Sequence, residues 1–289
     1  MLSSEVRALI EEAVRQAKAI PSPSIEEVSE VVVASCMGGE PWAAQLSLAL
    51  HHSGVRAVRM TCVEASIHVL PYSSGGERVV AFSSSSRDTH LAQLANAASA
   101  LGVRVTAYGP PPHPAYEDML RELGVEYNIV EVGSWSGIVA LLLATILWAP
   151  RPWESRRIRL DRELSTLSDS VNWVEEEYKD FIAELARGLD CLCYAPSTEP
   201  GVRLLRRTTK HNMLVAPLHD IEGFRGRRVA AVYSSAEEHA YRHQILSAKL
   251  RGVSVVDVRV NTDPLTASLY VVIAGLLAGS QVLRETGEG

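Results

Sequence analysis

The chain alternates between short apolar runs rich in β-branched residues and longer segments in which apolar residues recur at helical spacing. In the first half, the runs Val31–Ala34 and Val79–Phe82 are each followed by a helix-like segment, and the second half restarts the pattern at Cys191–Tyr194. Strands that are apolar at every position are typical of parallel sheets covered by helices on both faces. The alternation therefore predicts an α/β protein with a mainly parallel sheet, flanked by helices, in each half.

A break in composition separates the two halves. Residues Ala149–Asp169 contain prolines and a run of charges, which is typical of a connection between domains. A chain of 289 residues is also long for one compact core. We therefore expect an N-terminal domain over residues 1–150 and a C-terminal domain over residues 151–289.

Composition argues against several classes of partner. The 28 Lys and Arg residues face 34 Asp and Glu, a net charge of -6, so no basic field is left for nucleic acid. The arginine-rich segment Arg156–Arg159 is expected to be a solvated helix face or linker.

Two uncharged stretches, Ser134–Pro150 and Pro264–Leu283, are expected to be buried helices rather than membrane spans. Because Glu5 and Arg7 interrupt any N-terminal apolar run, we expect no secretory signal and a cytoplasmic protein.

The cysteines and histidines do not predict a metal centre. The chain has four cysteines, Cys36, Cys62, Cys191 and Cys193. They are too few for a disulfide scaffold and lack the CxxC spacing of a zinc site, so packed, reduced thiols are expected. His239 and His243 are spaced to share a helix face, but no third ligand is identifiable. We expect no metal and no cofactor.

A run of four serines, Ser83–Ser86, connects the apolar run Val79–Phe82 to a helix-like segment, His90–Leu101. The first N–H groups of a helix lack internal partners, so they form an anion site together with serine hydroxyls. Asp88, however, places a negative charge in the same turn. The loop either binds a phosphate or only resembles a phosphate loop, and the residues alone leave both interpretations open.

The order and spacing of several short motifs carry a family resemblance. They are Met37-Gly38-Gly39 and Ser83-x-Ser85 in the first half, then His211-Asn212, His219-Asp220 and Asp263-Pro264 in the second. In this arrangement the chain resembles the sugar isomerase (SIS) domain family. More narrowly, it looks like the archaeal-type bifunctional phosphoglucose/phosphomannose isomerases, which have two SIS domains. The resemblance covers nearly the whole chain.

The resemblance implies two SIS-type domains, a homodimer, and isomerisation between aldose and ketose forms of a hexose 6-phosphate (glucose, mannose or fructose type). His219 corresponds to the histidine that opens the sugar ring, and His211 to the general base. They are the catalytic candidates. The implied substrate-binding residues are Gly38, Gly39, Glu40, Ser83, Ser85, Ser86 and Asp88.

Two carboxylates depart from the family pattern at the substrate-binding motifs. Glu40 replaces a serine of the family's GMGGS turn, and Asp88 replaces the phosphate-binding threonine of its SxSGxT loop. Like charges ~4 Å apart repel by about 4 kcal/mol at an effective dielectric near 20, which would erase ordinary phosphate binding. Alternatively, each carboxylate faces solvent or complements the helix that it precedes.

The expected catalytic groups are also changed. The base position holds His211 instead of glutamate, the expected arginine falls on Trp135 or Ser136, and the expected lysine of the final helix falls near Ala274. A neutral histidine can still move protons, so one hypothesis is an isomerase that uses His211 and His219. A second is a non-catalytic SIS protein that binds a sugar derivative, as a sensor or partner subunit. A third is another SIS chemistry, such as epimerisation or amino-sugar handling, in which the acids pair with an ammonium group.

Overall fold

The structure, a computed structural model, divides into two compact units. The N-terminal unit is Glu12–Glu154, and the C-terminal unit combines Met1–Glu11 with Ser155–Gly289. The predicted domains, 1–150 and 151–289, stay a prediction; the compact units differ from them in placing the first eleven residues with the C-terminal unit. The residues described are 2–25, 30–72, 77–150, 154–208 and 213–285.

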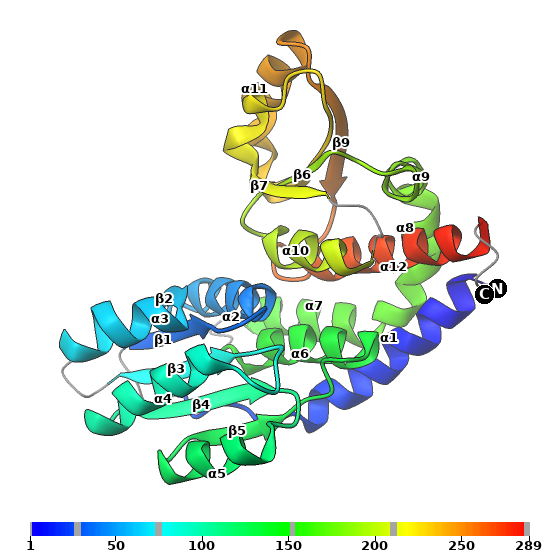
Figure 1. The fold of residues 1–289 in the computed structure, drawn as a ribbon. Coiled ribbons are helices and arrows are strands. Elements are labelled where there is room, and N and C mark those ends of the chain that lie inside the picture. Colours follow the sequence, from blue (N-terminus) through cyan, green and yellow to red (C-terminus); the bar gives the residue numbers. More distant parts are fainter. Residues whose placement is uncertain (1, 26–29, 73–76, 151–153, 209–212, 286–289) are drawn as a thin grey trace. The chain divides into compact units, whose positions relative to one another are not determined.

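Within the described residues, the N-terminal unit contains a five-stranded parallel sheet in the order β2-β1-β3-β4-β5 (Figure 1). The strands are β1 (Glu30–Ser35), β2 (Arg56–Thr61), β3 (Arg78–Phe82), β4 (Arg104–Gly109) and β5 (Glu126–Ile129). The helices are α1 (Leu2–Ala19, which runs across both units), α2 (Glu40–His52), α3 (Cys62–Glu64), η1 (Ala65–Val69), η2 (Leu70–Tyr72), α4 (Thr89–Ala100), α5 (Pro114–Glu122) and α6 (Trp135–Trp148).

The C-terminal unit repeats this plan with a four-stranded parallel sheet, counted over its described residues, in the order β7-β6-β8-β9. Its strands are β6 (Cys191–Tyr194), β7 (Leu214–Pro217), β8 (Arg228–Ser234) and β9 (Ser254–Val260). Its helices are α7 (Glu154–Ser165), η3 (Leu167–Asp169), α8 (Ser170–Glu177), α9 (Lys179–Arg187), α10 (Glu199–Thr208), η4 (Leu218–Gly223), η5 (Ser235–Glu237), α11 (Glu238–Leu250) and α12 (Ala267–Glu285). The α/β class, with parallel sheets flanked by helices, is as the sequence predicts.

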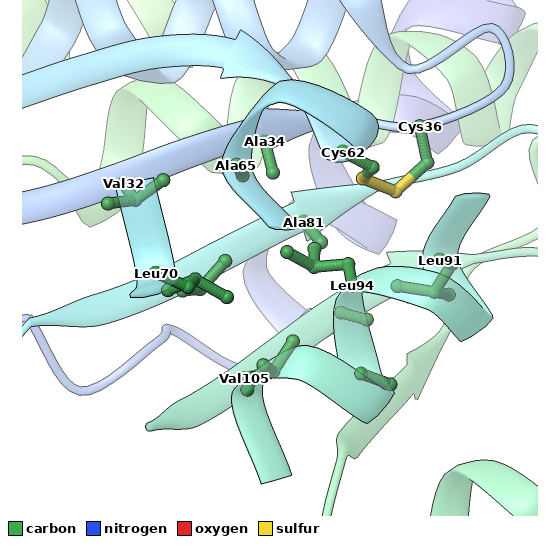
Figure 2. Packing of buried hydrophobic residues seen from close by; sticks show 14 of the residues in the cluster. Val32, Ala34, Cys36, Cys62, Ala65, Leu70, Ala81, Leu91, Leu94 and Val105 are labelled. Carbon is green, nitrogen blue, oxygen red and sulfur yellow. A yellow bond between two sulfur atoms is a disulfide. The ribbon is translucent and has the colours of Figure 1, made fainter. Parts of the chain in front are cut away.

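Apolar side chains on both faces of the strands explain why helices cover both sides of the N-terminal sheet. On one face, Val32 and Ala81 belong to a buried cluster with residues of α3 and α4 (Figure 2). On the other, Phe82 stacks on Trp148 of α6, and the indole N–H of Trp42 in α2 donates to the carbonyl of Ile138, 3.1 Å away. The sheet is thus buried from two sides, as continuous apolar strands require.

The two uncharged stretches of the sequence form α6 and α12, and both are buried helices, as expected. Among the described residues, none of the helices is apolar over a long enough stretch to cross a membrane.

In both sheets, the direction in which successive strands are added reverses after the second strand. The first strand of each sheet, β1 or β6, is an inner strand; β2 or β7 is added on one side of it, and β3 or β8 is then added on the other side. In open parallel sheets, ligands bind beyond the carboxyl ends of the strands at such a reversal. In the N-terminal unit, this point lies between the turn after β1 and the serine loop after β3.

The expectation that all four cysteines are reduced is wrong. Cys36 and Cys62 form a disulfide, whereas Cys191 and Cys193 carry free, buried thiols. The disulfide forms because Ser35 pairs with Thr61 in neighbouring strands, which places the next residue of each strand side by side. The arginine-rich segment lies in α7 with Arg157 and Arg159 exposed to solvent, as expected, and in addition Arg156 and Arg159 both bind the buried carboxylate of Asp263.

Candidate functional site

The turn after β1 depends on its two glycines. Gly38 has a φ of 68°, a conformation that favours glycine. A Cβ atom on Gly39 would lie 2.0 Å from the carbonyl oxygen of Phe82, the last residue of β3. Only a glycine lets the turn approach the end of β3 this closely, and the turn therefore lies against the start of the serine loop.

Hydrogen bonds join this turn to the serine loop. The backbone N–H of Ser84 donates to the carbonyl of Met37 at 2.8 Å, and the Ser84 hydroxyl donates to the same oxygen at 3.0 Å. Ser83 is buried, Ser85 is half-buried and Ser86 is exposed. The structure therefore brings the predicted glycines and serines together at one point of the N-terminal unit, with hydroxyls of the loop facing solvent.

The carboxylate of Asp88 is buried at the centre of this point, with 3% of the residue exposed. Four hydrogen-bond donors in the described part of the chain reach it. Its Oδ1 accepts from the backbone N–H groups of His90 and Leu91 at 3.0 and 3.1 Å. Its Oδ2 accepts from the backbone N–H of Met37 at 2.8 Å and from the Ser83 hydroxyl at 2.5 Å. Asp88 is the N-cap of α4, so it complements the positive end of that helix.

Asp88 therefore accepts hydrogen bonds from donors that the serine loop was expected to offer to an anion. The N–H groups at the start of α4 and the hydroxyl of Ser83 are satisfied by a carboxylate of the same chain. Sequence reasoning named both orientations of Asp88 as alternatives. It could not find the contact with Met37, because that residue is 51 positions away.

Glu40 behaves differently from Asp88. It is exposed in the first turn of α2, and the N-cap residue Gly39 offers that helix no side-chain cap. Its charge still lies near the positive end of the helix. Glu40 is consequently the carboxylate that remains open to solvent beside the turn.

The C-terminal unit has an equivalent carboxylate that sequence reasoning missed. Glu237 Oε1 accepts from the backbone N–H of Ser197 at 3.0 Å. Its Oε2 accepts from the Ser197 hydroxyl, and from the backbone N–H and hydroxyl of Ser234 at 3.0 and 2.8 Å. Ser197 follows β6 and Ser234 ends β8, so this is the reversal point of the second sheet. A signal was present in the sequence: Ser234 and Glu237 have the S-x-x-E spacing of a capping box.

Of the two predicted catalytic histidines, the structure describes only His219. His211 lies outside the described residues. His219 follows β7 in η4, its side chain is 63% exposed, and its Nε2 lies 3.6 Å from Asp220 Oδ1. The imidazole of His219 is thus exposed to solvent beside an exposed carboxylate, and its catalytic role stays a prediction.

The other expected catalytic positions carry no charge. Trp135 and Ser136 begin α6, and the Ser136 hydroxyl lies 3.2 Å from that of Ser134. Ala274 is buried in α12. In the part of the chain that the structure describes, no three His, Cys, Asp or Glu residues are grouped as metal ligands would be.

Buried Asp263, which follows β9, and half-buried Glu163 of α7 have opposite pKa shifts. Burial raises the pKa of Asp263, but hydrogen bonds from Arg156, the Leu265 N–H and Arg159 outweigh it, so the pKa lies below its ordinary value. Burial raises the pKa of Glu163, whose Oε1 accepts from the Thr266 hydroxyl at 2.5 Å. Sequence reasoning did not single out Glu163, because its burial depends on how α7 packs against α12.

Solved structures with the same fold include several proteins named for sugar phosphates. The C-terminal domain of glucosamine-fructose-6-phosphate aminotransferase from Francisella tularensis matches 99% of this chain and 96% of its own, with a TM-score of 0.69 and 10% identity. Glucosamine-6-phosphate deaminase from Thermotoga maritima matches 98% and 92%, with a TM-score of 0.66 and 14% identity. Tagatose-6-phosphate ketose/aldose isomerase from Escherichia coli matches 99% and 93%, with a TM-score of 0.61 and 10% identity.

At these identities the likeness concerns the fold alone. No protein-family model and no curated protein sequence matches the chain.

Proposed function

We propose that this protein is a SIS-fold protein that binds a carbohydrate derivative without a phosphate at the serine loop, and that it does not isomerise sugar phosphates. The observation that carries the proposal is the Asp88 carboxylate, buried at the anion position with four donors. In this proposal, the likeness to archaeal-type phosphoglucose/phosphomannose isomerases reflects a shared architecture, and the phosphosugar chemistry is lost.

Electrostatics support the exclusion of phosphate. A phosphate at this position would replace Asp88 as acceptor of the same N–H groups, or would lie beside a second negative charge. Repulsion of about 4 kcal/mol at ~4 Å corresponds to roughly a thousandfold loss of affinity. The exposed carboxylate of Glu40 at the same turn acts in the same direction.

The changed residues support the loss of catalysis. Isomerisation needs a placed acid and base and a cation that stabilises the enediolate. Trp135 and Ser136 stand where the arginine is expected, and the segment Leu265–Val282 contains no lysine. His219 is a solvent-exposed side chain in η4.

The surface of the N-terminal site supports a polar, uncharged ligand. Ser84 and Ser85 are half-buried and Ser86 is exposed, so the loop presents hydroxyl and backbone groups that suit sugar hydroxyls. The adjoining Met37 is 44% exposed and offers an apolar surface for the face of a sugar ring. A homodimer, a cytoplasmic location and the two SIS domains belong to the same proposal, because they rest on the resemblance.

A coupled assay tests the catalytic half of the proposal. Purified protein at high concentration is expected to give no turnover of fructose 6-phosphate or mannose 6-phosphate. The control is His219→Ala, measured in parallel. Turnover by the wild-type protein that disappears in His219→Ala would establish the isomerase hypothesis instead.

A thermal-shift series tests the binding half. Neutral and aminated sugars are compared with glucose 6-phosphate, and the wild-type protein is expected to respond to a sugar without a phosphate. Asp88→Thr is expected to gain a response to glucose 6-phosphate, whereas the matched variant Glu237→Gln, in the other unit, gains none. A wild-type protein that prefers glucose 6-phosphate to every uncharged sugar would contradict the proposal.

A further inference from the structure

The Cys36–Cys62 disulfide lies directly beside the turn of the ligand site. Cys36 is the residue before Met37, and Cys62 is the first residue of α3. The two Cα atoms are 5.0 Å apart, and both cysteines are buried. Figure 2 shows the bond among the side chains of the cluster that also contains Leu91 and Leu94 of α4. The bond therefore joins the start of the turn to the core of the N-terminal unit.

The turn that follows Cys36 is also held by backbone hydrogen bonds: the N–H of Cys36 donates to the carbonyl of Phe82 at 2.9 Å, and the N–H of Gly39 donates to the carbonyl of Cys36 at 3.0 Å. The Met37 side chain is 44% exposed, and the next two residues are Gly38 and Gly39, whose backbones are intrinsically flexible. The backbone of Met37 nevertheless makes the contacts that close the site: its N–H donates to Asp88, and its carbonyl accepts from Ser84. The disulfide adds a covalent restraint on Met37, from the side of Cys36, to these hydrogen bonds.

The same buried cluster also supports Asp88 from its other side. Leu91 packs in the cluster with Cys36 and Cys62, and its backbone N–H donates to Asp88 Oδ1 at 3.1 Å. The two N–H donors of Met37 and Leu91, one to each carboxylate oxygen, therefore both adjoin the buried cluster that the disulfide cross-links. Losing the covalent bond would release the Met37 side alone, because Leu91 stays within α4.

We propose that the Cys36–Cys62 disulfide is a positioning element of the ligand site, which holds the Met37 N–H on Asp88 and so keeps the anion position closed to phosphate. The proposal rests on the proposed function. Its test measures the closure of the turn and inorganic phosphate binding, and neither depends on whether the protein turns over a sugar.

Reduction of the wild-type protein gives the first test. Dithiothreitol breaks the sulfur–sulfur bond, each cysteine takes up one electron and one proton, and the reagent closes to its cyclic disulfide. Thiol titration after unfolding confirms the reaction, because the oxidised protein carries two free thiols, Cys191 and Cys193, and the reduced protein all four cysteines. Amide hydrogen exchange at Met37 and Ser84 is expected to accelerate at least tenfold, while Ser197 and Ser234 keep their rates.

A matched pair of variants gives the second test. Cys62→Ala removes a buried sulfur without changing the turn, and Cys193→Ala removes a buried, unbonded sulfur in the C-terminal unit. Both are expected to lower the melting temperature. In calorimetric titration, only Cys62→Ala is expected to bind inorganic phosphate at least tenfold more tightly than the wild-type protein.

Two outcomes would overturn the proposal. One is unchanged exchange at Met37 and Ser84 after the bond is broken, which would mean that the hydrogen bonds hold the turn unaided. The other is faster exchange with unchanged phosphate affinity, which would mean that the disulfide does not keep the position closed. If Cys62→Ala does not fold, phosphate titration of the reduced wild-type protein supplies the same comparison.

Discussion

At the point where the strand order reverses, each of the two units has a carboxylate that accepts hydrogen bonds from neighbouring loops, but the surroundings of the two carboxylates differ. In the N-terminal unit, Asp88 caps α4 and also binds the turn after β1. In the C-terminal unit, Glu237 binds the end of β8 and the segment after β6, and its side chain does not cap α11. Asp88, with the shorter side chain, accepts its hydrogen bonds at the N-cap of α4. Glu237, with the longer side chain, accepts its hydrogen bonds from three positions after the end of β8. In both units a carboxylate of the chain itself accepts hydrogen bonds from backbone and hydroxyl donors at this point of the fold.

The surroundings of the two carboxylates differ more than the carboxylates themselves. Ser197 and Ser234 are almost completely buried, so the hydroxyls that Glu237 binds do not face solvent. Beside Asp88, hydroxyls of the serine loop, the Met37 side chain and Glu40 are open to solvent. This difference in exposure is the reason that the proposed ligand surface is placed on the N-terminal unit and not at Glu237.

The largest expected effect tests how closely the N-terminal turn must pack. Gly39→Ala should destabilise the protein by about 3 kcal/mol or more, because its Cβ would overlap the carbonyl of Phe82. Gly223→Ala is the control, since no atom lies within 4 Å of the position that its methyl group would take. Urea unfolding followed by circular dichroism measures both. Similar midpoints for the two variants would show that the turn can move away from β3.

Removing each carboxylate tests the comparison directly. Asp88→Ala should cost about 3 kcal/mol, because it removes a helix cap and leaves buried donors unsatisfied. Glu237→Ala should cost about 2 kcal/mol, since Glu237 is only half-buried. Inorganic phosphate in the millimolar range should raise the melting temperature of Asp88→Ala and leave Glu237→Ala unchanged. Equal responses would erase the functional difference between the units.

Glu163 gives a pH-dependent effect confined to the C-terminal unit. Burial raises the pKa of Glu163 in the folded state, so the folded protein holds this proton more tightly than the unfolded chain does. The free energy of unfolding therefore falls as the pH rises from the ordinary pKa of a glutamate through the raised pKa of the folded state. Glu163→Gln removes the ionisation, so its melting temperature relative to wild type should be higher at pH 8 than at pH 4. A difference that is the same at both pH values would mean that Glu163 has an ordinary pKa.

The smallest expected effect separates two glutamates that begin equivalent helices. Glu40 starts α2 and is exposed, while Glu199 starts α10, is buried, and accepts a hydrogen bond from Arg203 at 2.8 Å. Glu40→Gln should cost about 0.5 kcal/mol at low salt and less at high salt, because it loses only a screened interaction with the helix dipole. Glu199→Gln should cost more and depend less on salt. Thermal unfolding at two ionic strengths distinguishes the two cases.

The sequence alone determined the class of fold and the position of the glycine turn and the serine loop at the ends of strands. Apolar runs at Val31–Ala34 and Val79–Phe82 predicted buried parallel strands, and the glycine turn and serine loop were placed at their ends. The two uncharged stretches were correctly predicted as buried helices. These features depend on local periodicity and turn chemistry, which neighbouring residues carry by themselves.

Only the tertiary structure decided what the polar groups at these positions do. The Cys36–Cys62 bond depends on the register of β1 and β2, and the contact of Asp88 with Met37 depends on β3 lying next to β1. Arg159 and Asp263 are 104 residues apart, yet they form one ion pair. Such contacts follow from which elements lie side by side in the folded chain. The sequence does not show this arrangement, so it could not show that the carboxylate of Asp88 is buried and accepts hydrogen bonds from the chain itself.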